Sequence, residues 1–151
     1  MIWRGSAPTP VGDLHFEVDE STLISATFGR LTDPSLALRK KSDIHQAVSQ
    51  YFDGELNAFD TLDVYQPGTE FMDSVYEHMR EISPGDVTTY GRLAARAGYP
   101  RAARAVGTVC ARNQVVLFVP CHRVVASAGL GGYGYGTEIK KFLLTHEGVN
   151  Y

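Results

Sequence analysis

The spacing of apolar residues in this chain of 151 residues changes at Pro67-Gly68. Before this dipeptide, residues 14–18 alternate apolar and polar side chains, as a strand with one buried face does. After it, apolar side chains recur three or four positions apart over residues 71–82, which is the spacing of one helix face. A proline–glycine pair is also a strong turn signal. We therefore predict two domains, residues 1–66 and residues 67–151.

The N-terminal domain has the pattern of a small antiparallel sheet with one helix. Turn residues at 10–13 and 19–21 bound two segments with strand-like alternation. Farther along, apolar side chains share one helical stripe that stops at Asp53-Gly54. The predicted strands are 14–18, 23–28 and 61–65, and the predicted helix covers residues 36–52.

The C-terminal domain is predicted to be mostly helical. Thr89 is placed to cap a short helix, and Gly98-Tyr99-Pro100 separates that helix from a second one rich in alanine and arginine. Two short helices joined by a tight turn are typical of a DNA-binding helix-turn-helix. The apolar run Val115–Val119 predicts a buried strand, and glycines predict a loop over residues 129–136. The predicted helices are 70–82, 90–97, 101–110 and 139–146.

Charge is unevenly distributed along the chain, and this favours a nucleic-acid partner. Residues 1–66 carry five Lys/Arg and ten Asp/Glu (5 - 10 = -5), whereas residues 67–151 carry nine and seven (9 - 7 = +2). The stretch Val87–Thr137 holds six arginines and no acidic residue. The total of -3 argues against nucleic-acid binding, but phosphates respond to the local surface that they meet.

Neither a membrane segment nor a metal site is predicted. No apolar run is long enough to cross a bilayer, and the first residues lack the apolar stretch of a signal peptide, so we expect a cytoplasmic protein. The two cysteines, Cys110 and Cys121, are too few for a disulfide framework. They form no CxxC pair and no Cys/His cluster at zinc spacing.

The sharpest local feature is the segment Pro120-Cys121-His122-Arg123-Val124-Val125. Proline fixes φ and removes a backbone donor, so it ends the predicted strand and presents Cys121 at a rigid exit. The neighbouring His122 and Arg123 are expected to favour the thiolate over the thiol. The alternative is that Cys121 is a buried packing residue, which is the commoner fate of a cysteine.

This segment resembles the active-site signature of the O6-alkylguanine-DNA alkyltransferases. The resemblance extends over residues 67–149, with the matching segments in the expected order and spacing. Residues 1–66 are similar to the family only in length and in their strand–helix style. The further matching segments are Gly85–Ala94 and Arg101–Gly107 for the helix-turn-helix, Gly132–Gly136 for the active-site loop, and Leu143–Gly148 for the closing helix.

The resemblance implies an alkyl transfer from O6 of guanine to the protein, irreversible and once per molecule. Cys121 would accept the alkyl group, with O4-alkylthymine as a second substrate. His122 would act as general base through a water molecule, and Glu147 would orient it. Tyr90 would hydrogen-bond or protonate the departing guanine. No cofactor is implied, because the substrate supplies the alkyl group.

The resemblance also implies how DNA is bound. Ala102, Ala103 and Gly107 would leave one face of the recognition helix nearly bare, so that its backbone approaches the minor groove. Arg104 would enter the base stack and fill the gap left by the flipped nucleotide. Asn113 would be the hinge after this helix, its side chain bonding local backbone. The partner is double-stranded DNA containing O6-alkylguanine, with the protein as a monomer and no membrane involved.

The substrate pocket would be formed by the reactive segment and the glycine-rich loop. The carbonyls of Cys121 and Val124 would accept from the guanine amino group, and the Gly134 N–H would donate to O6. Tyr133 and Lys140 would form part of the wall and hold the loop. Three features depart from the family pattern: Gln114 replaces the usual proline, Cys110 stands at an apolar position, and Tyr135 adds bulk to the loop.

The predicted fold class is α/β, of the α+β type. A small ribonuclease-H-like antiparallel sheet with a helix precedes a mostly helical domain with a winged-helix-like helix-turn-helix. Three other functions stay open. A cysteine hydrolase would need an oxyanion hole and leaves the arginine-rich helix-turn-helix unexplained. A non-catalytic damage sensor lacks a cysteine at the acceptor position. A helix-turn-helix regulator would bind paired half-sites as a dimer.

Overall fold

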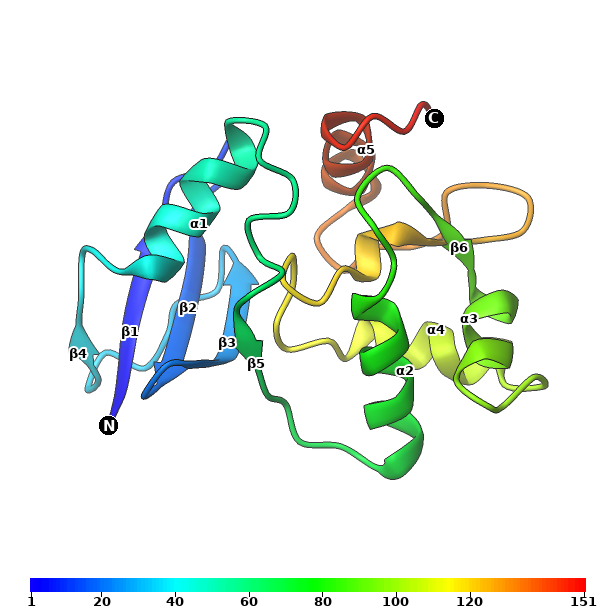
Figure 1. The fold of residues 1–151 in the computed structure, drawn as a ribbon, viewed down its shortest axis with the longest axis horizontal. Coiled ribbons are helices and arrows are strands. Elements are labelled where there is room, and N and C mark those ends of the chain that lie inside the picture. Colours follow the sequence, from blue (N-terminus) through cyan, green and yellow to red (C-terminus); the bar gives the residue numbers. More distant parts are fainter. The chain divides into compact units, whose positions relative to one another are not determined.

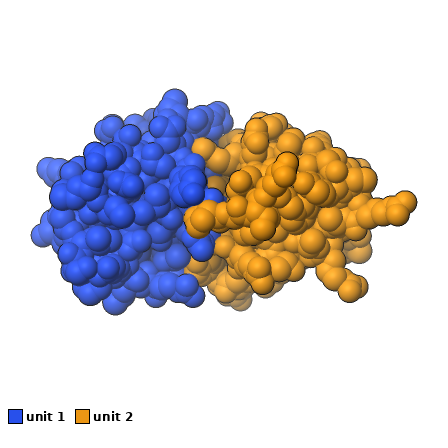
Figure 2. All heavy atoms as spheres, turned by 90° about the horizontal axis from the view of Figure 1, so that it is seen from below, with its two compact units in different colours: residues 1–66, 114–118 blue, residues 67–113, 119–151 orange.

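The computed structural model describes residues 1–151 and divides into two compact units, shown in different colours in Figure 2. Unit 1 comprises Met1–Gln66 together with Gln114–Phe118. Unit 2 comprises Pro67–Asn113 and Val119–Tyr151. The chain therefore leaves unit 2 after Asn113, contributes a short segment to unit 1, and returns just before Cys121. The two predicted domains, divided after residue 66, do not include this return of residues 114–118 to unit 1.

The sheet of unit 1 has five strands, of which the central three are antiparallel (Figure 1). Each edge is a strand of two residues that pairs in parallel with its neighbour. The helix α1 (Asp43–Phe52) packs against β1 and buries Ile44, Ala47, Val48 and Tyr51. The strand order is β4-β1-β2-β3-β5, with β1 (Ile2–Ala7), β2 (Leu14–Asp19), β3 (Thr22–Phe28), β4 (Ala37–Leu38) and β5 (Asp63–Val64).

For this unit one strand was missed and one expectation is wrong. The strand β1 was not predicted, because its inward positions Trp3, Gly5 and Ala7 include two small residues that give no apolar signal. The helix expected over residues 36–52 begins only at Asp43. Its start is fixed by Ser42, whose hydroxyl accepts from two backbone N–H groups of the first turn. The residues before it form β4 instead.

Residues 115–118 are buried, but they do not form the strand predicted over residues 115–119. Only Val115 forms a bridge, to Ala26 of β3, with N–H···O distances of 2.8 and 3.0 Å on either side. At Leu117 the backbone turns into the left-handed region with φ of 74°, which is unfavourable for a residue with a branched side chain. Apolar runs predict burial, and burial is found; they do not by themselves predict an extended chain.

Unit 2 contains the predicted helices, and none of their ends is shifted by more than two residues. α2 (Glu70–Arg80) and α3 (Tyr90–Arg96) are capped by the hydroxyls of Thr69 and Thr89, as expected. α2 packs against α3 and α4, and α3 packs against α4, which gives the helix-turn-helix (Figure 1). The other elements are α4 (Ala103–Ala111), the 3-10 turn η1 (Cys121–Arg123), α5 (Thr137–His146), and the parallel pair β6 (Thr88–Thr89) and β7 (Val124–Val125).

The α+β fold class predicted from the sequence is confirmed. The longest helix, α2, has 11 residues. None of the helices has the length and apolar character required to span a membrane.

Gly5 provides a test of packing in unit 1. A Cβ at this position would lie 2.8 Å from the Phe16 ring and 2.9 Å from the His45 ring. We expect Gly5→Ala to lower the free energy of unfolding by about 1–3 kcal/mol, because overpacking forces these rings to move. Gly91→Ala is the matched control, since nothing lies within 4 Å of that position in α3. Urea denaturation should show a loss for the first variant and none for the second; equal effects would contradict this packing.

Candidate functional site

Cys121 lies in unit 2 at the start of η1, immediately after Pro120, and is 5% exposed. Three elements bring other side chains toward this turn. β7 continues from η1 and pairs with β6, which leads directly into α3 and Tyr90. α5 packs against η1 and carries Lys140, with Glu147 as its C-terminal cap residue. The chain segments that hold the predicted catalytic residues are thus in direct contact.

His122, Arg123 and Glu147 form one buried hydrogen-bonded group. Nε2 of His122 lies 2.9 Å from Oε2 of Glu147. Arg123 donates from Nε to Oε1 and from Nη2 to Oε2 of the same carboxylate, both at 2.9 Å. Its remaining Nη1 donates to the Ile82 carbonyl at 2.7 Å. A bidentate guanidinium–carboxylate pair of this kind fixes both side chains in orientation.

The surroundings set the protonation states of this group. Burial alone would raise the pKa of Glu147, but the hydrogen bonds and charges of His122 and Arg123 outweigh it and hold that pKa well below its ordinary value. Burial is also the main cause that lowers the pKa of His122, so the imidazole is neutral at physiological pH. Its Nδ1 is buried without a hydrogen-bond partner. The network therefore assigns the proton to Nε2 and leaves Nδ1 as a free acceptor.

The thiol of Cys121 is influenced by residues other than those predicted. Burial raises its pKa, whereas a hydrogen bond from the Asn113 side chain and the charge of Lys140 lower it. The Asn113 amide also donates to the Val119 carbonyl at 2.8 Å. The sequence-based expectation that Arg123 favours the thiolate is not supported, because its guanidinium is engaged by Glu147.

Lys140 is fully buried and joins two backbone segments. Its Nζ donates to the Val124 carbonyl at 2.7 Å and to the Gly132 carbonyl at 3.0 Å. The same atom lies 5.9 Å from the centroid of the Tyr90 ring. Lys140 therefore connects β7, the glycine-rich loop and the first residue of α3.

The glycine-rich loop passes close to the hydroxyl of Tyr90. A Cβ on Gly131 would lie 2.7 Å from this oxygen, and Gly131 has a φ of 77°, so only glycine is suited to the position. Burial raises the pKa of Tyr90, and a hydrogen bond from the Gly132 backbone partly offsets this rise. Farther along the loop, Tyr133 is half-buried with its ring 5.7 Å from that of Tyr135, and Gly134 is exposed.

The predicted DNA-contacting residues lie on α4 and at its start. Ala102 and Ala103 are half-buried at the first turn, Arg104 is exposed, and Gly107 has no atom within 4 Å of its Cβ position. α4 instead buries Val106 and Val109 on its other face. The arginines of the acid-free stretch Val87–Thr137 are exposed except for Arg123, namely Arg92, Arg96, Arg101, Arg104 and Arg112.

Sequence reasoning missed two features of this region. Arg123 is the partner of Glu147, and the only available hint was its place beside His122. The hydroxyl of Thr88 is buried without a hydrogen-bond partner, and no pattern in the sequence indicated it. Cys110 is half-buried on α4, and burial, followed by the charge of Cys121, raises its pKa to about 12.

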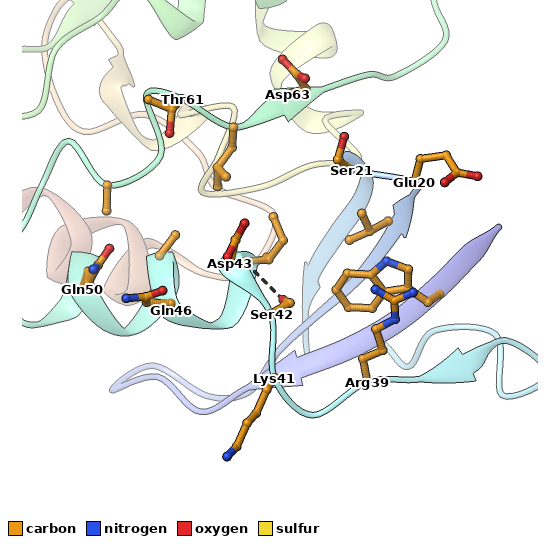
Figure 3. A pocket seen from close by; sticks show the side chains of 16 residues that line it. Glu20, Ser21, Arg39, Lys41, Ser42, Asp43, Gln46, Gln50, Thr61 and Asp63 are labelled. Atoms are coloured by element: carbon orange, nitrogen blue, oxygen red, sulfur yellow. Dashed lines mark hydrogen bonds between the residues drawn. The ribbon is translucent and has the colours of Figure 1, made fainter.

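One pocket is lined entirely by residues of unit 1. It has a volume of about 690 Å³, and Figure 3 shows its polar lining. Arg39 and Lys41 line it together with the acidic Glu20, Asp43 and Asp63. This mixture of charges selects no class of ligand. No group of three or more His, Cys, Asp or Glu side chains is arranged to hold a metal ion.

Comparison with known proteins agrees with this geometry. The family model described as 6-O-methylguanine DNA methyltransferase, DNA binding domain, matches residues 70–149. The methylated-DNA–protein-cysteine methyltransferase of Methanosarcina acetivorans is 38% identical, over 93% of this chain and 94% of the relative.

Solved structures are also similar. Mycobacterium tuberculosis OGT in complex with DNA has a TM-score of 0.87 and 32% identity, covering 95% of this chain and 91% of that chain. The O6-methylguanine-DNA methyltransferase of Pyrococcus kodakaraensis has a TM-score of 0.74 and 31% identity, covering 99% and 100%.

A helix-turn-helix in the same unit as a buried Cys121 and a buried His122–Glu147 pair is typical of a DNA-binding protein with a candidate nucleophilic cysteine. The chain belongs to the O6-methylguanine-DNA methyltransferase family, and it is a methylated-DNA–protein-cysteine methyltransferase that acts in DNA repair. The resemblance noted in the sequence is thereby confirmed.

The buried carboxylate of Glu147 makes stability depend on pH. Its pKa is lower in the folded than in the unfolded protein, so its contribution is complete above about pH 4.5 and is lost as pH falls. We expect Glu147→Gln to lower the free energy of unfolding by about 3–5 kcal/mol at pH 7, because Arg123 loses its counter-charge. Denaturation at pH 7, 5 and 3 should show this difference shrinking below pH 4.5.

The control is Glu138→Gln, which changes an exposed carboxylate in the first turn of α5. It should leave stability nearly unchanged at each pH. A constant difference between wild type and Glu147→Gln from pH 7 to pH 3 would show that ionisation of Glu147 does not stabilise the fold.

Proposed function

We propose that the protein removes the alkyl group from O6-alkylguanine in duplex DNA by irreversible transfer to Cys121, once per molecule. The observation that carries this proposal is the buried thiol at the start of η1, adjacent in sequence to a neutral His122 whose Nδ1 has no partner. O4-alkylthymine, which presents the same kind of O-alkyl bond, is proposed as a second substrate.

In the proposed reaction, the proton of Cys121 passes through a water molecule to Nδ1 of His122. The thiolate attacks the alkyl carbon in line. A carbon–sulfur bond forms, the bond from that carbon to O6 breaks, and its electron pair stays with guanine. Tyr90 donates its hydroxyl proton, or a hydrogen bond, to the departing base. Glu147 holds the imidazole through Nε2, at the 2.9 Å seen here.

The base is proposed to be read by backbone groups. The carbonyls of Cys121 and Val124 accept from its amino group, and the Gly134 N–H donates to O6. Val124 already accepts from Lys140 at 2.7 Å, which leaves its second lone pair for the substrate. Lys140 and Tyr133 hold the loop that carries Gly134.

We propose that α4 binds the minor groove and that the damaged nucleotide is flipped out of the duplex. The exposed Arg104 enters the stack, while Ala102, Ala103 and the open position at Gly107 allow close approach of the backbone. Residues 67–151 would then serve both DNA binding and alkyl transfer. A monomeric state and a cytoplasmic location stay predictions.

A non-catalytic damage sensor, or a helix-turn-helix protein without chemistry, is the alternative. The presence of Cys121 favours transfer over both. A cysteine hydrolase would form a thioester whose carbonyl admits water, so it would turn over. A thioether has no such route, and thiols do not exchange with it.

Stoichiometry tests the transfer. Incubation with a duplex containing O6-methylguanine should add one methyl group per protein, located on the peptide containing Cys121 by mass spectrometry. Cys121→Ala should abolish transfer and keep binding to alkylated DNA, while Cys110→Ser should still react. Repeated turnover, or methyl groups found on Cys110, would contradict the proposal.

Arg104 tests nucleotide flipping. Because only duplex DNA requires a base to be extruded, Arg104→Ala should slow repair of duplex DNA far more than reaction with free O6-methylguanine base. Arg112→Ala, which removes an exposed arginine just after α4, is the control. An equal loss on both substrates would place Arg104 in the pocket or the fold instead.

A further inference from the structure

The buried ionisable groups of unit 2 leave one positive charge without a partner. Arg123 and Glu147 neutralise each other through two hydrogen bonds. Lys140 is equally buried, but both acceptors of its Nζ are neutral carbonyls, and it forms no ion pair. An uncompensated ammonium in the protein interior is costly. The region is therefore one negative charge short when Cys121 is a thiol.

We propose that Lys140 is the counter-charge of the Cys121 thiolate. It acts as a positioning residue that favours the reactive form of the nucleophile, in addition to holding the loop. The inference builds on the proposed function in taking Cys121 as the nucleophile. Ionisation of Cys121 places a negative charge near the uncompensated ammonium, and two opposite charges attract each other more strongly in a medium of low polarity than in water.

The effects of the two groups on each other agree with this assignment. Burial is the main cause that raises the pKa of Cys121, and Lys140 is the charged side chain that opposes it, beside the Asn113 hydrogen bond. Burial lowers the pKa of Lys140, and Cys121, followed by Cys110, opposes that change. Each group thus favours the charged form of the other.

No other side chain around the thiol supplies this charge. Burial makes His122 neutral, and its Nε2 faces Glu147. The titratable groups of α2, α3 and α4 that interact electrostatically with Cys121 are Tyr76, Tyr90 and Cys110. Burial is the first cause that raises the pKa of each, to about 12 for Tyr76 and for Cys110, so all three are neutral at physiological pH.

The proposal has a consequence for the reacted protein. Transfer converts the thiolate into a neutral thioether, and the electron pair of the broken carbon–oxygen bond leaves with the base. Lys140 then stays buried without its counter-charge. Its pKa should fall, because the thiolate that favoured the ammonium form is gone.

Lys140→Gln tests the charge while keeping an N–H donor for the loop. The test measures the rate at which iodoacetamide labels Cys121 as a function of pH, in a Cys110→Ser background so that one thiol reacts. Without Lys140 the thiolate is less stable, so the midpoint should move about one pH unit higher, with about tenfold slower labelling below it. Lys141→Gln, an exposed neighbour, should leave the profile unchanged.

An unshifted midpoint in folded Lys140→Gln would overturn the proposal and leave Lys140 as a support of the loop alone. Should that variant fail to fold, the pKa of the Lys140 side chain in the wild-type protein provides a second test of the proposal. NMR titration of Lys140 Nζ before and after Cys121 is carbamidomethylated should show a fall in its pKa, and an unchanged pKa would overturn the proposal. Neither measurement uses DNA, so failure of alkyl transfer from DNA would be seen separately.

Discussion

Glu147 is a carboxylate placed in the interior of unit 2, and most of the site depends on how its charge is stabilised there. Arg123 provides the stabilisation by donating to both carboxylate oxygens, and the same guanidinium donates to the carbonyl of Ile82. The three residues come from η1, from the end of α5 and from the chain just after α2. An isolated buried charge is far less stable than a paired one, so these segments are held together as a unit. His122 is oriented as part of that arrangement.

Lys140 is the second buried cation of unit 2, and its partners are of a different kind. Arg123 faces a carboxylate and forms a neutral pair, whereas Lys140 faces only carbonyls of β7 and the glycine-rich loop. Its position is therefore fixed by hydrogen bonds while its charge remains uncompensated. The two cations of this interior thus differ in their surroundings: Arg123 pairs with the carboxylate that also binds the imidazole, whereas Lys140 is the one that we propose favours the Cys121 thiolate.

The site is built from very short elements. η1 has three residues, and β6 and β7 have two each. Segments of this length have little intrinsic stability, and their conformation comes from the side chains that pack and bond around them. The close approach of the loop to Tyr90 adds a further restriction, since Gly131 tolerates no Cβ. Rigid presentation of Cys121 is consequently a property of the whole of unit 2.

Much of the fold followed from the sequence, because local patterns have local causes. Helix starts at Thr69 and Thr89, the helical stripes of unit 2, and the turn at residues 98–100 are set by neighbouring residues. The resemblance over residues 67–149 added the family and named Cys121, His122 and Glu147 as a relay. The strand β1 and the late start of α1 were missed because small residues and a serine cap give weak periodic signals.

What the tertiary structure alone decided concerns charges and buried backbone. Arg123 and Lys140 both carry a positive charge in the sequence, and nothing there shows that one meets a carboxylate and the other does not. Which acceptors a buried cation finds depends on residues 8 to 41 positions away, such as Gly132 for Lys140 and Ile82 for Arg123. The apolar run 115–119 likewise predicted that the segment is buried but did not predict its backbone conformation. Apolar composition determines that a segment is buried. The groups that contact it in the interior determine its backbone conformation and the protonation states of its side chains.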